Sequence, residues 1–192
     1  MEDIVRRRDP DVQSLERTAA GDQTGFEELV RKYEHPILNT IYRYIGDYSE
    51  AEDIAQEVFL KVWRNAGKFE GKSKFSTWLY RIVVNECLNH KTKNKVRPIS
   101  VGETVERMKT PESLRIESEY ERRERAEIVR KAINELPEMQ RIALILANYD
   151  GHSYKEIARM MGVSLSSVTS LIFRAKDNLR KKLLPLRMRR EI

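Results

Sequence analysis

The stretch SEAEDIAQEVFLKVWRNA, residues 49–66, decides the fold because its apolar side chains recur with the spacing of one amphipathic helix. Ser49 and Glu52 have the pattern of a capping box, which predicts that the helix begins there. One face collects the expected core residues Ala51, Ile54, Ala55, Val58, Phe59 and Val62. The opposite face surrounds Leu60 with Asp53, Gln56, Glu57 and Arg64. This face favours a docking surface, although a single exposed leucine is also ordinary.

A second predicted helix runs from Ser76 to about Lys91 and is apolar almost all round. Its one polar strip holds Trp78, Arg81, Asn85 and Asn89. Nucleobases stack on aromatic rings and hydrogen-bond to amide groups, so this strip is typical of a surface for unpaired bases.

The loop KFEGKSKFSTW, residues 68–78, joins these helices and alternates basic and aromatic side chains: Lys68, Phe69, Lys72, Lys74 and Phe75. Lysines can follow a phosphate backbone while aromatic rings take bases. The alternative is that the two phenylalanines hold the loop on the core.

Two motifs in order, DIAQEVFLKVW (53–63) and KFSTWLYRIVVN (74–85), resemble domain two of bacterial sigma factors of the sigma-70 family, in the short form found in extracytoplasmic-function (ECF) sigma factors. In that family the first helix binds the clamp helices of the RNA polymerase β′ subunit. The loop and second helix open and read the minus-ten promoter element. Core RNA polymerase and promoter DNA, both duplex and single-stranded, are therefore the expected partners.

The resemblance also assigns residues. It implies polymerase contacts at Asp53, Gln56, Glu57 and Trp63, to which we add Leu60 from the same surface. It implies minus-ten contacts at Phe75, Trp78, Arg81 and Asn85, to which we add Lys72, Lys74 and Asn89 from the loop and the strip. After Asn85 the family commonly has an Asp then Arg pattern, whereas this chain has Asn89, His90 and Thr92. The bases that it discriminates in the minus-ten element can therefore differ.

Composition limits the function classes. The 192 residues include 36 basic and 30 acidic side chains, a net charge of +6 that permits a polyanionic partner. The single cysteine, Cys87, and three histidines that lie far apart in the sequence predict no internal disulfide and no metal site. We find no Walker-type loop, GxGxxG or nucleophile elbow, so no cofactor and no enzyme activity are expected. An enzyme that uses Glu52, Asp53 and Glu57 as a carboxylate cluster is a remote alternative, since a third ligand on the same face is missing.

The chain also carries no sign of membrane insertion. It has no run of about eighteen apolar residues, and MEDIVRRRDPDVQ at the start lacks the apolar centre of a signal peptide. A cytoplasmic protein is expected, associated with the nucleoid when active.

Residues 1–95 are expected to form the first domain, a bundle of about four helices. A short helix is predicted near Val12 to Ala20, followed by one that a Thr24 and Glu27 capping box begins. Pro36 suits the first turn of the next helix, which Gly46 should end. Residues 96–111 contain Pro98, Gly102 and Pro111 and predict a flexible linker, which in the resembling family threads through the polymerase.

Residues 112–192 are expected to form a second helical domain. Its first helix has the apolar stripe Ile128, Val129, Ala132, Ile133 and Leu136, and Pro137 opens the next. A capping box at Ser153 and Glu156, a turn at Gly162 and a cap at Ser164 have the spacing of a helix-turn-helix. Its second helix should bury Leu165, Val168, Leu171 or Ile172, and Leu179, and present Ser166, Ser167, Ser170, Arg174 and Lys181 to DNA.

This second domain resembles sigma domain four, which reads the minus-thirty-five element and touches the β flap. Thr169 and Leu171 stand where ECF relatives often carry basic residues. The resemblance therefore does not predict which minus-thirty-five sequence this domain reads. The expected fold class is therefore all-α, with two small helical domains joined by the linker, and the expected function is that of an ECF sigma factor silenced by an anti-sigma factor. The alternative is a helix-turn-helix regulator that binds duplex DNA without polymerase, which would have no need of the strip around Trp78.

Overall fold

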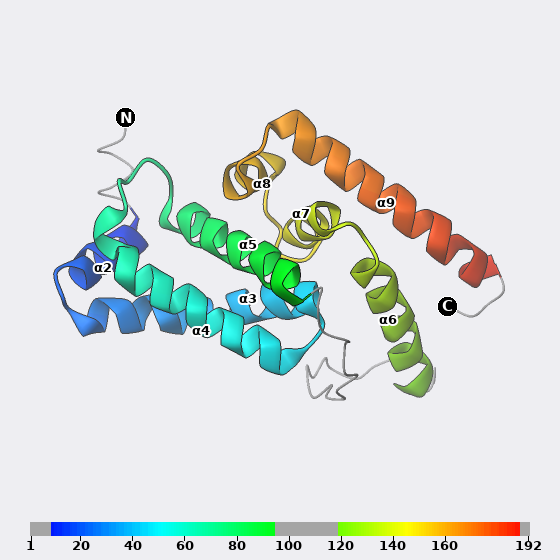
Figure 1. Ribbon diagram of the computed structural model, residues 1–192, viewed down its shortest axis with the longest axis horizontal. Helices are drawn as coiled ribbons and strands as arrows, with labels where there is room; N and C mark the ends of the chain where they lie inside the picture. The colour runs from blue at the N-terminus through cyan, green and yellow to red at the C-terminus, as the bar shows by residue number, and fades with distance from the viewer. Residues whose placement is uncertain (1–8, 95–118, 189–192) are drawn as a thin grey trace.

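The computed structural model describes residues 9–94 and 119–188, and all regular secondary structure in these ranges is helical (Figure 1). The first range contains α2 (Pro10–Ala19), α3 (Gln23–Ile45), α4 (Tyr48–Asn65), a 3-10 turn η1 (Ala66–Lys68) and α5 (Phe75–Asn94). The second contains α6 (Glu119–Asn134), α7 (Glu138–Asn148), α8 (Tyr154–Met161) and α9 (Leu165–Met188). The all-α prediction is confirmed, and the predicted linker 96–111 lies outside the described residues.

Aspartates cap helices α3 and α4. Asp22 accepts a hydrogen bond from the Thr24 amide at 2.9 Å, and Asp47 accepts one from the Glu50 amide at 2.9 Å. The capping boxes predicted at Thr24 and at Ser49 are therefore wrong, and both helices begin earlier. Aspartate, serine and threonine offer equivalent acceptors at a helix start, and in each case the sequence contained two such candidates two residues apart.

Helix α3 continues through Pro36, and the break predicted there is wrong. A proline inside a helix costs about 3 kcal/mol or more. An unbroken stripe of buried side chains crosses the proline: Leu29, Tyr33, Ile37, Ile41 and Tyr44. Each such side chain contributes roughly 1.5–3 kcal/mol on burial, so packing of the whole stripe outweighs the cost of the proline. The helix ends at Gly46 in the left-handed conformation, with φ of 91°, as predicted.

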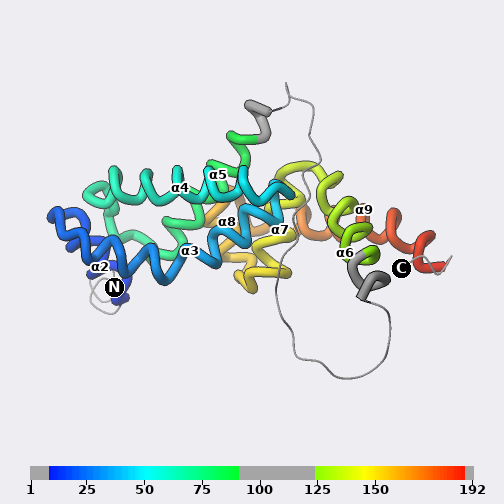
Figure 2. The backbone as a smooth tube through the Cα atoms, turned by 90° about the horizontal axis from the view of Figure 1, so that it is seen from below, coloured from blue at the N-terminus to red at the C-terminus, as the bar shows by residue number. Residues whose placement is uncertain are grey.

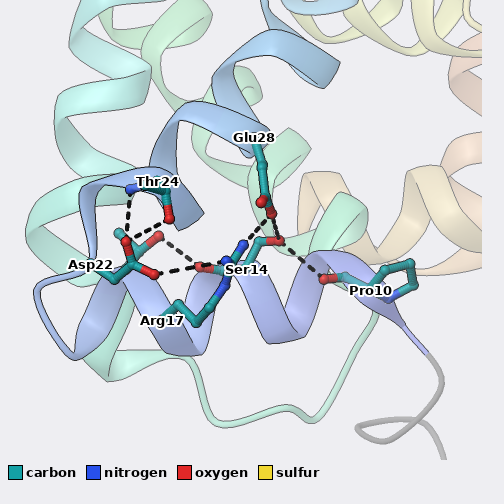
Figure 3. A network of polar contacts seen from close by, with 7 residues as sticks. Pro10, Ser14, Arg17, Asp22, Thr24 and Glu28 are labelled. Carbon is teal, nitrogen blue, oxygen red and sulfur yellow. Dashed lines mark hydrogen bonds and ion pairs between the residues drawn. The ribbon is translucent and has the colours of Figure 1, made fainter.

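Helix α2 is fixed against α3 by a close approach and a polar network. A Cβ on Gly25 would lie 2.5 Å from the Ser14 carbonyl oxygen, so only glycine permits this separation. Figure 3 shows Ser14 and Arg17 of α2 both bonded to Glu28 of α3, with Ser14 Oγ 2.7 Å from the Glu28 carboxylate. Val12 and Leu15 of α2 belong to the same apolar core as the buried residues of α3, α4 and α5.

One apolar core runs through both described ranges. It joins buried residues of α2 to α5, such as Ile41 and Val83, to residues of α7 to α9, such as Ile145 and Val168. Helix α8 packs on α5, and α7 packs on α3. Figures 1 and 2 show α7 and α8 beside the first four helices, with α9 on their far side. The sequence predicted two helical units, but their packing against each other was not foreseen.

Candidate nucleic-acid and polymerase interface

Helix α4 has the two sides that its sequence predicts. All six residues of the expected core side are buried. On the other side Asp53, Gln56 and Glu57 are exposed, and Leu60 and Trp63 are 43% and 40% exposed. The Trp63 ring also packs edge-on against Phe26, with centroids 5.1 Å apart. The helix thus presents acids and an amide beside two large apolar side chains whose surface is only partly used within the chain.

The polar strip on α5 is also present. Arg81, Asn85 and Asn89 are exposed, while Trp78 is half-buried. The Trp78 ring contacts Phe69 edge-on at 5.5 Å between centroids and lies 6.0 Å from Phe75. These neighbours fix the indole in place, so a base that stacks on it would meet a preorganised surface.

Phe75 does not belong to that surface. Its side chain has no exposed area and packs against Tyr33 at 5.4 Å between ring centroids. It is the first residue of α5, where the Phe75 amide also approaches the Asp9 carboxylate at 3.4 Å. The structure therefore favours the alternative in which Phe75 holds the loop on the core, and a direct contact of Phe75 with DNA is not supported.

An open cavity of about 570 Å³ lies between α4 and α5 beside the strip. Its lining is rich in amides and lysines: Lys61, Asn65, Lys68, Trp78, Ile82, Asn85, Glu86, Leu88 and Asn89. Lys61 forms an ion pair with Glu86 across it. The volume lies within the range of ligand pockets, and the lining offers stacking, hydrogen-bonding and cationic groups together. The lining residues that were not predicted are Lys61, Asn65, Ile82, Glu86 and Leu88. The i, i+4 spacing of Lys61 and Asn65 places these two on one side of α4.

The loop between η1 and α5 presents its lysines to solvent. Gly71 takes a positive φ of 71°, which turns the chain. Lys72 and Lys74 are exposed, and the Lys72 ammonium lies 2.5 Å from the Glu70 carboxylate. This ammonium lowers the pKa of Glu70 through a hydrogen bond and charge attraction. An exposed pair of this kind is weak and can be exchanged for a phosphate.

The helix-turn-helix has the predicted geometry. Ser153 and Glu156 form a complete capping box, in which the Glu156 carboxylate accepts from the Ser153 amide at 3.0 Å. Gly162 turns the chain with φ of 66°. The Ser164 hydroxyl accepts from the Ser167 amide at 3.1 Å and so caps α9. The hydrogen bonds of Ser153 lower the pKa of Glu156.

Helix α9 presents the residues expected to face DNA. Exposed side chains on it include Ser166, Ser167, Ser170, Arg174 and Lys181. Val168 and Ile172 are buried as predicted, but Leu165 is 44% exposed, so its predicted burial is wrong. Helical spacing places Leu165 on the buried face, but burial also needs a packing partner at the first turn. Phe173, which was not predicted, is 72% exposed one turn beyond Thr169.

The described residues also constrain other kinds of site. Between 9 and 94 and between 119 and 188, we find no cluster of three or more histidine, cysteine or acidic side chains that could hold a metal ion. In the same ranges no helix combines the length and the apolar character needed to cross a membrane.

Comparisons with known proteins agree with this geometry. The family model described as Sigma-70 region 2 matches residues 29–97, and that described as Sigma-70, region 4 matches residues 126–179. The RNA polymerase sigma-H factor of Pseudomonas aeruginosa is 40% identical over 186 residues, which cover 93% of this chain and 96% of that protein. The ECF RNA polymerase sigma-E factor of Escherichia coli is 35% identical over 184 residues, which cover 90% and 93%.

A solved structure has the same fold. The sigma factor RpoE, in complex with the anti-sigma factor NepR from Bartonella quintana, superimposes with a TM-score of 0.63 at 23% identity. The match covers 82% of this chain and 96% of that chain.

Proposed function

Because the chain belongs to the sigma-70 family and is an RNA polymerase sigma factor of the ECF type, we propose that three of its surfaces divide the work of transcription initiation. The outer side of α4 binds the β′ clamp helices of core polymerase. The α5 strip and the preceding loop bind the opened minus-ten element. Helix α9 binds the minus-thirty-five element as duplex.

The observation that carries the proposal is the position of Trp78. Its half-buried indole stands at the edge of a cavity whose lining adds the amides of Asn85 and Asn89 and the ammonium of Lys61. Unstacking a base costs a few kcal/mol, and stacking on an aromatic ring returns about 1–3 kcal/mol. Hydrogen bonds from the amides can supply the remainder, which makes this edge of α5 suitable for holding unpaired promoter bases.

The polymerase surface joins charge to apolar anchors. Asp53, Gln56 and Glu57 lie on the exposed side of α4, and Leu60 and Trp63 follow on the same helix. Aromatic side chains such as tryptophan are common anchors of protein interfaces, and charges set the orientation and the association rate. Charged and amide groups beside Leu60 and Trp63 therefore indicate that this side of α4 is covered by a partner protein.

The proposed minus-thirty-five surface consists of the first turns of α9 and the basic side chains that follow along the same helix. Ser166, Ser167 and Ser170 bring short hydroxyl groups close to bases or phosphates, and Arg174 and Lys181 add charge. We also assign Phe173 to this surface, since an exposed ring next to Arg174 can contact a thymine methyl group. The same domain is proposed to touch the β flap.

We propose residues 1–95 as the polymerase and minus-ten domain, 96–111 as the linker and 112–192 as the minus-thirty-five domain. Neither DNA-binding domain needs high affinity alone. Once one domain has bound its promoter element, the linker raises the effective concentration of the other domain at the second element. The family's role is binding and not catalysis, so no catalytic residue and no cofactor are assigned.

An anti-sigma factor is the proposed regulator. The solved RpoE structure is a complex with the anti-sigma factor NepR, and its fold is that of this chain. By its family we further propose that the protein acts in the cytoplasm, at the nucleoid when active. The alternative of a duplex-only regulator is not favoured, because it leaves the surface around Trp78 without a purpose.

The division of labour is tested by separating polymerase binding from DNA opening. Asp53→Ala and Glu57→Ala should weaken binding to purified core polymerase, measured by competition with labelled wild-type chain. Glu52→Ala removes another exposed acid of the same helix and should bind as the wild type does. Equal losses in all three variants would contradict the assignment of the α4 surface.

A further inference from the structure

Helix α9 exposes two neighbouring rows of side chains that differ in chemistry. In each row one residue follows another by one helical turn, so the side chains lie on the same side of the helix. The first row is polar and consists of Ser166, Ser170 and Arg174. The second row, which we call the apolar row, consists of Leu165, Thr169 and Phe173. All six side chains are exposed.

The two large side chains of the apolar row lie open to solvent. Leu165 is 44% exposed and Phe173 is 72% exposed. The other side of α9 buries Val168 and Ile172, so the helix is held on its own domain without the apolar row. Exposed apolar side chains that are grouped on one face mark an interaction site.

Thr169 contributes a methyl group to the apolar row. Its hydroxyl donates to the Leu165 carbonyl oxygen at 3.0 Å, one turn earlier in the same helix. This bond uses the hydroxyl hydrogen and holds the oxygen toward the backbone. The γ-methyl group is therefore the part of Thr169 that remains for a contact outside the helix, between the isobutyl group of Leu165 and the ring of Phe173.

The charge of α9 indicates which kind of molecule covers the apolar row. The exposed cations of the helix include Arg174, Lys176, Arg180, Lys181 and Arg187. Asp177 is the one acidic residue in the sequence of α9, and its carboxylate lies 2.8 Å from the Lys181 ammonium. Such an excess of positive charge fits a polyanion, and duplex DNA is a polyanion with base edges exposed in its grooves.

The apolar row is long enough to meet several base pairs. Phe173 follows Leu165 by eight residues, which corresponds to about 12 Å along an α-helix. Stacked base pairs are about 3.4 Å apart, so the row spans about three or four of them. The major groove admits an α-helix, and the first turns of the second helix of a helix-turn-helix reach the base edges there.

The base edges of the major groove carry one kind of apolar group, the C5-methyl group of thymine, and threonine methyl groups and phenylalanine rings contact it. We propose that the apolar row reads thymine methyl groups, so that this chain selects a minus-thirty-five element with two or three thymines within about four consecutive base pairs. This inference rests on the proposed function for the identity of the element. The polar row beside it supplies hydrogen bonds to neighbouring bases or phosphates.

The first experiment finds the element without assuming its sequence. Holoenzyme reconstituted from core polymerase and the full chain binds duplex promoters whose minus-thirty-five region is random, and the bound DNA is sequenced. We expect thymines to be enriched at two or three neighbouring positions. Each is then replaced by deoxyuridine, which removes the methyl group and keeps the base pair. At fixed salt, the apparent Kd should rise about fourfold for each contacted methyl group, the effect of one buried methyl group on affinity.

Two substitutions of Thr169 assign one of these contacts. Thr169→Ser removes the methyl group and keeps the hydroxyl, so deoxyuridine at one thymine position should no longer weaken binding. Thr169→Val keeps a methyl group and should retain the preference for thymine over deoxyuridine. Phe173→Ala should abolish the preference at a different position. Ser170→Ala, in the polar row, is the matched control and should weaken binding to thymine and deoxyuridine promoters by the same factor.

The outcomes separate this inference from the proposed function. An enriched element that binds equally well with thymine and with deoxyuridine overturns the inference and keeps the proposed function. A deoxyuridine effect of the same size in the wild type, Thr169→Ser and Phe173→Ala also overturns it. If Phe173→Ala weakens the binding of core polymerase and leaves the thymine preference unchanged, the apolar row faces a protein. If holoenzyme enriches no minus-thirty-five element, the proposed role of α9 fails together with the inference.

Discussion

Replacing Trp78 by alanine should impair promoter opening more than it impairs folding or polymerase binding. The ring is half-buried against Phe69 and Phe75, so the variant loses part of one aromatic cluster. Stacking of one base on an aromatic side chain contributes about 1–3 kcal/mol. Loss of that contribution lowers the equilibrium for opening by roughly 5- to 160-fold. Phe75→Ala instead removes a fully buried ring and should cost about 3–5 kcal/mol of unfolding free energy.

The assay uses 2-aminopurine in the non-template strand of a minus-ten element, whose fluorescence rises when the base unstacks. Holoenzyme is reconstituted on a promoter first found by mapping the start sites that this chain directs. Trp63→Ala replaces the only other tryptophan and provides the matched control. It should weaken core binding but give normal opening once polymerase is saturated. Normal opening by Trp78→Ala at saturating polymerase would refute the role of the indole as a base platform.

Three further predictions follow from buried or capping groups. Arg141→Met leaves three carbonyl oxygens without their donor and should lower the unfolding free energy by about 1–3 kcal/mol, measured by urea denaturation; an unchanged midpoint would show that water satisfies them. The Cys87 thiol is fully buried, and burial raises its pKa, so its reaction with a thiol reagent at pH 8 should require unfolding and accelerate with urea; a fast reaction in native buffer would contradict its burial. Glu156 has a pKa lowered from 4.5 by Ser153, so its capping contribution is full above that pH and fades as the pH falls through the lowered pKa. Glu156→Gln should therefore lose less stability than the wild type on acidification, and parallel losses would exclude a contribution from this carboxylate.

The spacing of apolar residues predicted those helices that pack on helices close to them in the sequence. The buried side of α4, the stripe of α3 and the glycine turns at positions 46 and 162 follow from local pattern and backbone conformation. Details that depend on competition between nearby groups could not be predicted from this local pattern. Asp22 and Asp47 capped their helices although hydroxyl residues stood close by, and Pro36 was carried inside a helix because the packing of its neighbours outweighs its cost.

The candidate site shows the same limit. The exposed strip on α5 was predictable because Arg81, Asn85 and Asn89 recur every four residues, which places them on one side of a helix. The burial of Phe75 was not, since a phenylalanine at a loop end can face either the core or solvent, and only packing against Tyr33 decides. Contacts between parts distant in sequence, such as Thr40 with Asp150, carry no local signal at all.

The most direct test is transcription by core polymerase from fragmented genomic DNA of the source organism, with and without the purified chain, followed by sequencing of RNA 5′ ends. The account predicts a set of new start sites that share paired sequence elements at a fixed spacing. It predicts that Glu57→Ala restores these starts fully at higher protein concentration, while Trp78→Ala leaves them weaker than the wild type does even at saturating concentration. Start sites unaltered by the chain, or restored equally by both variants, would contradict it.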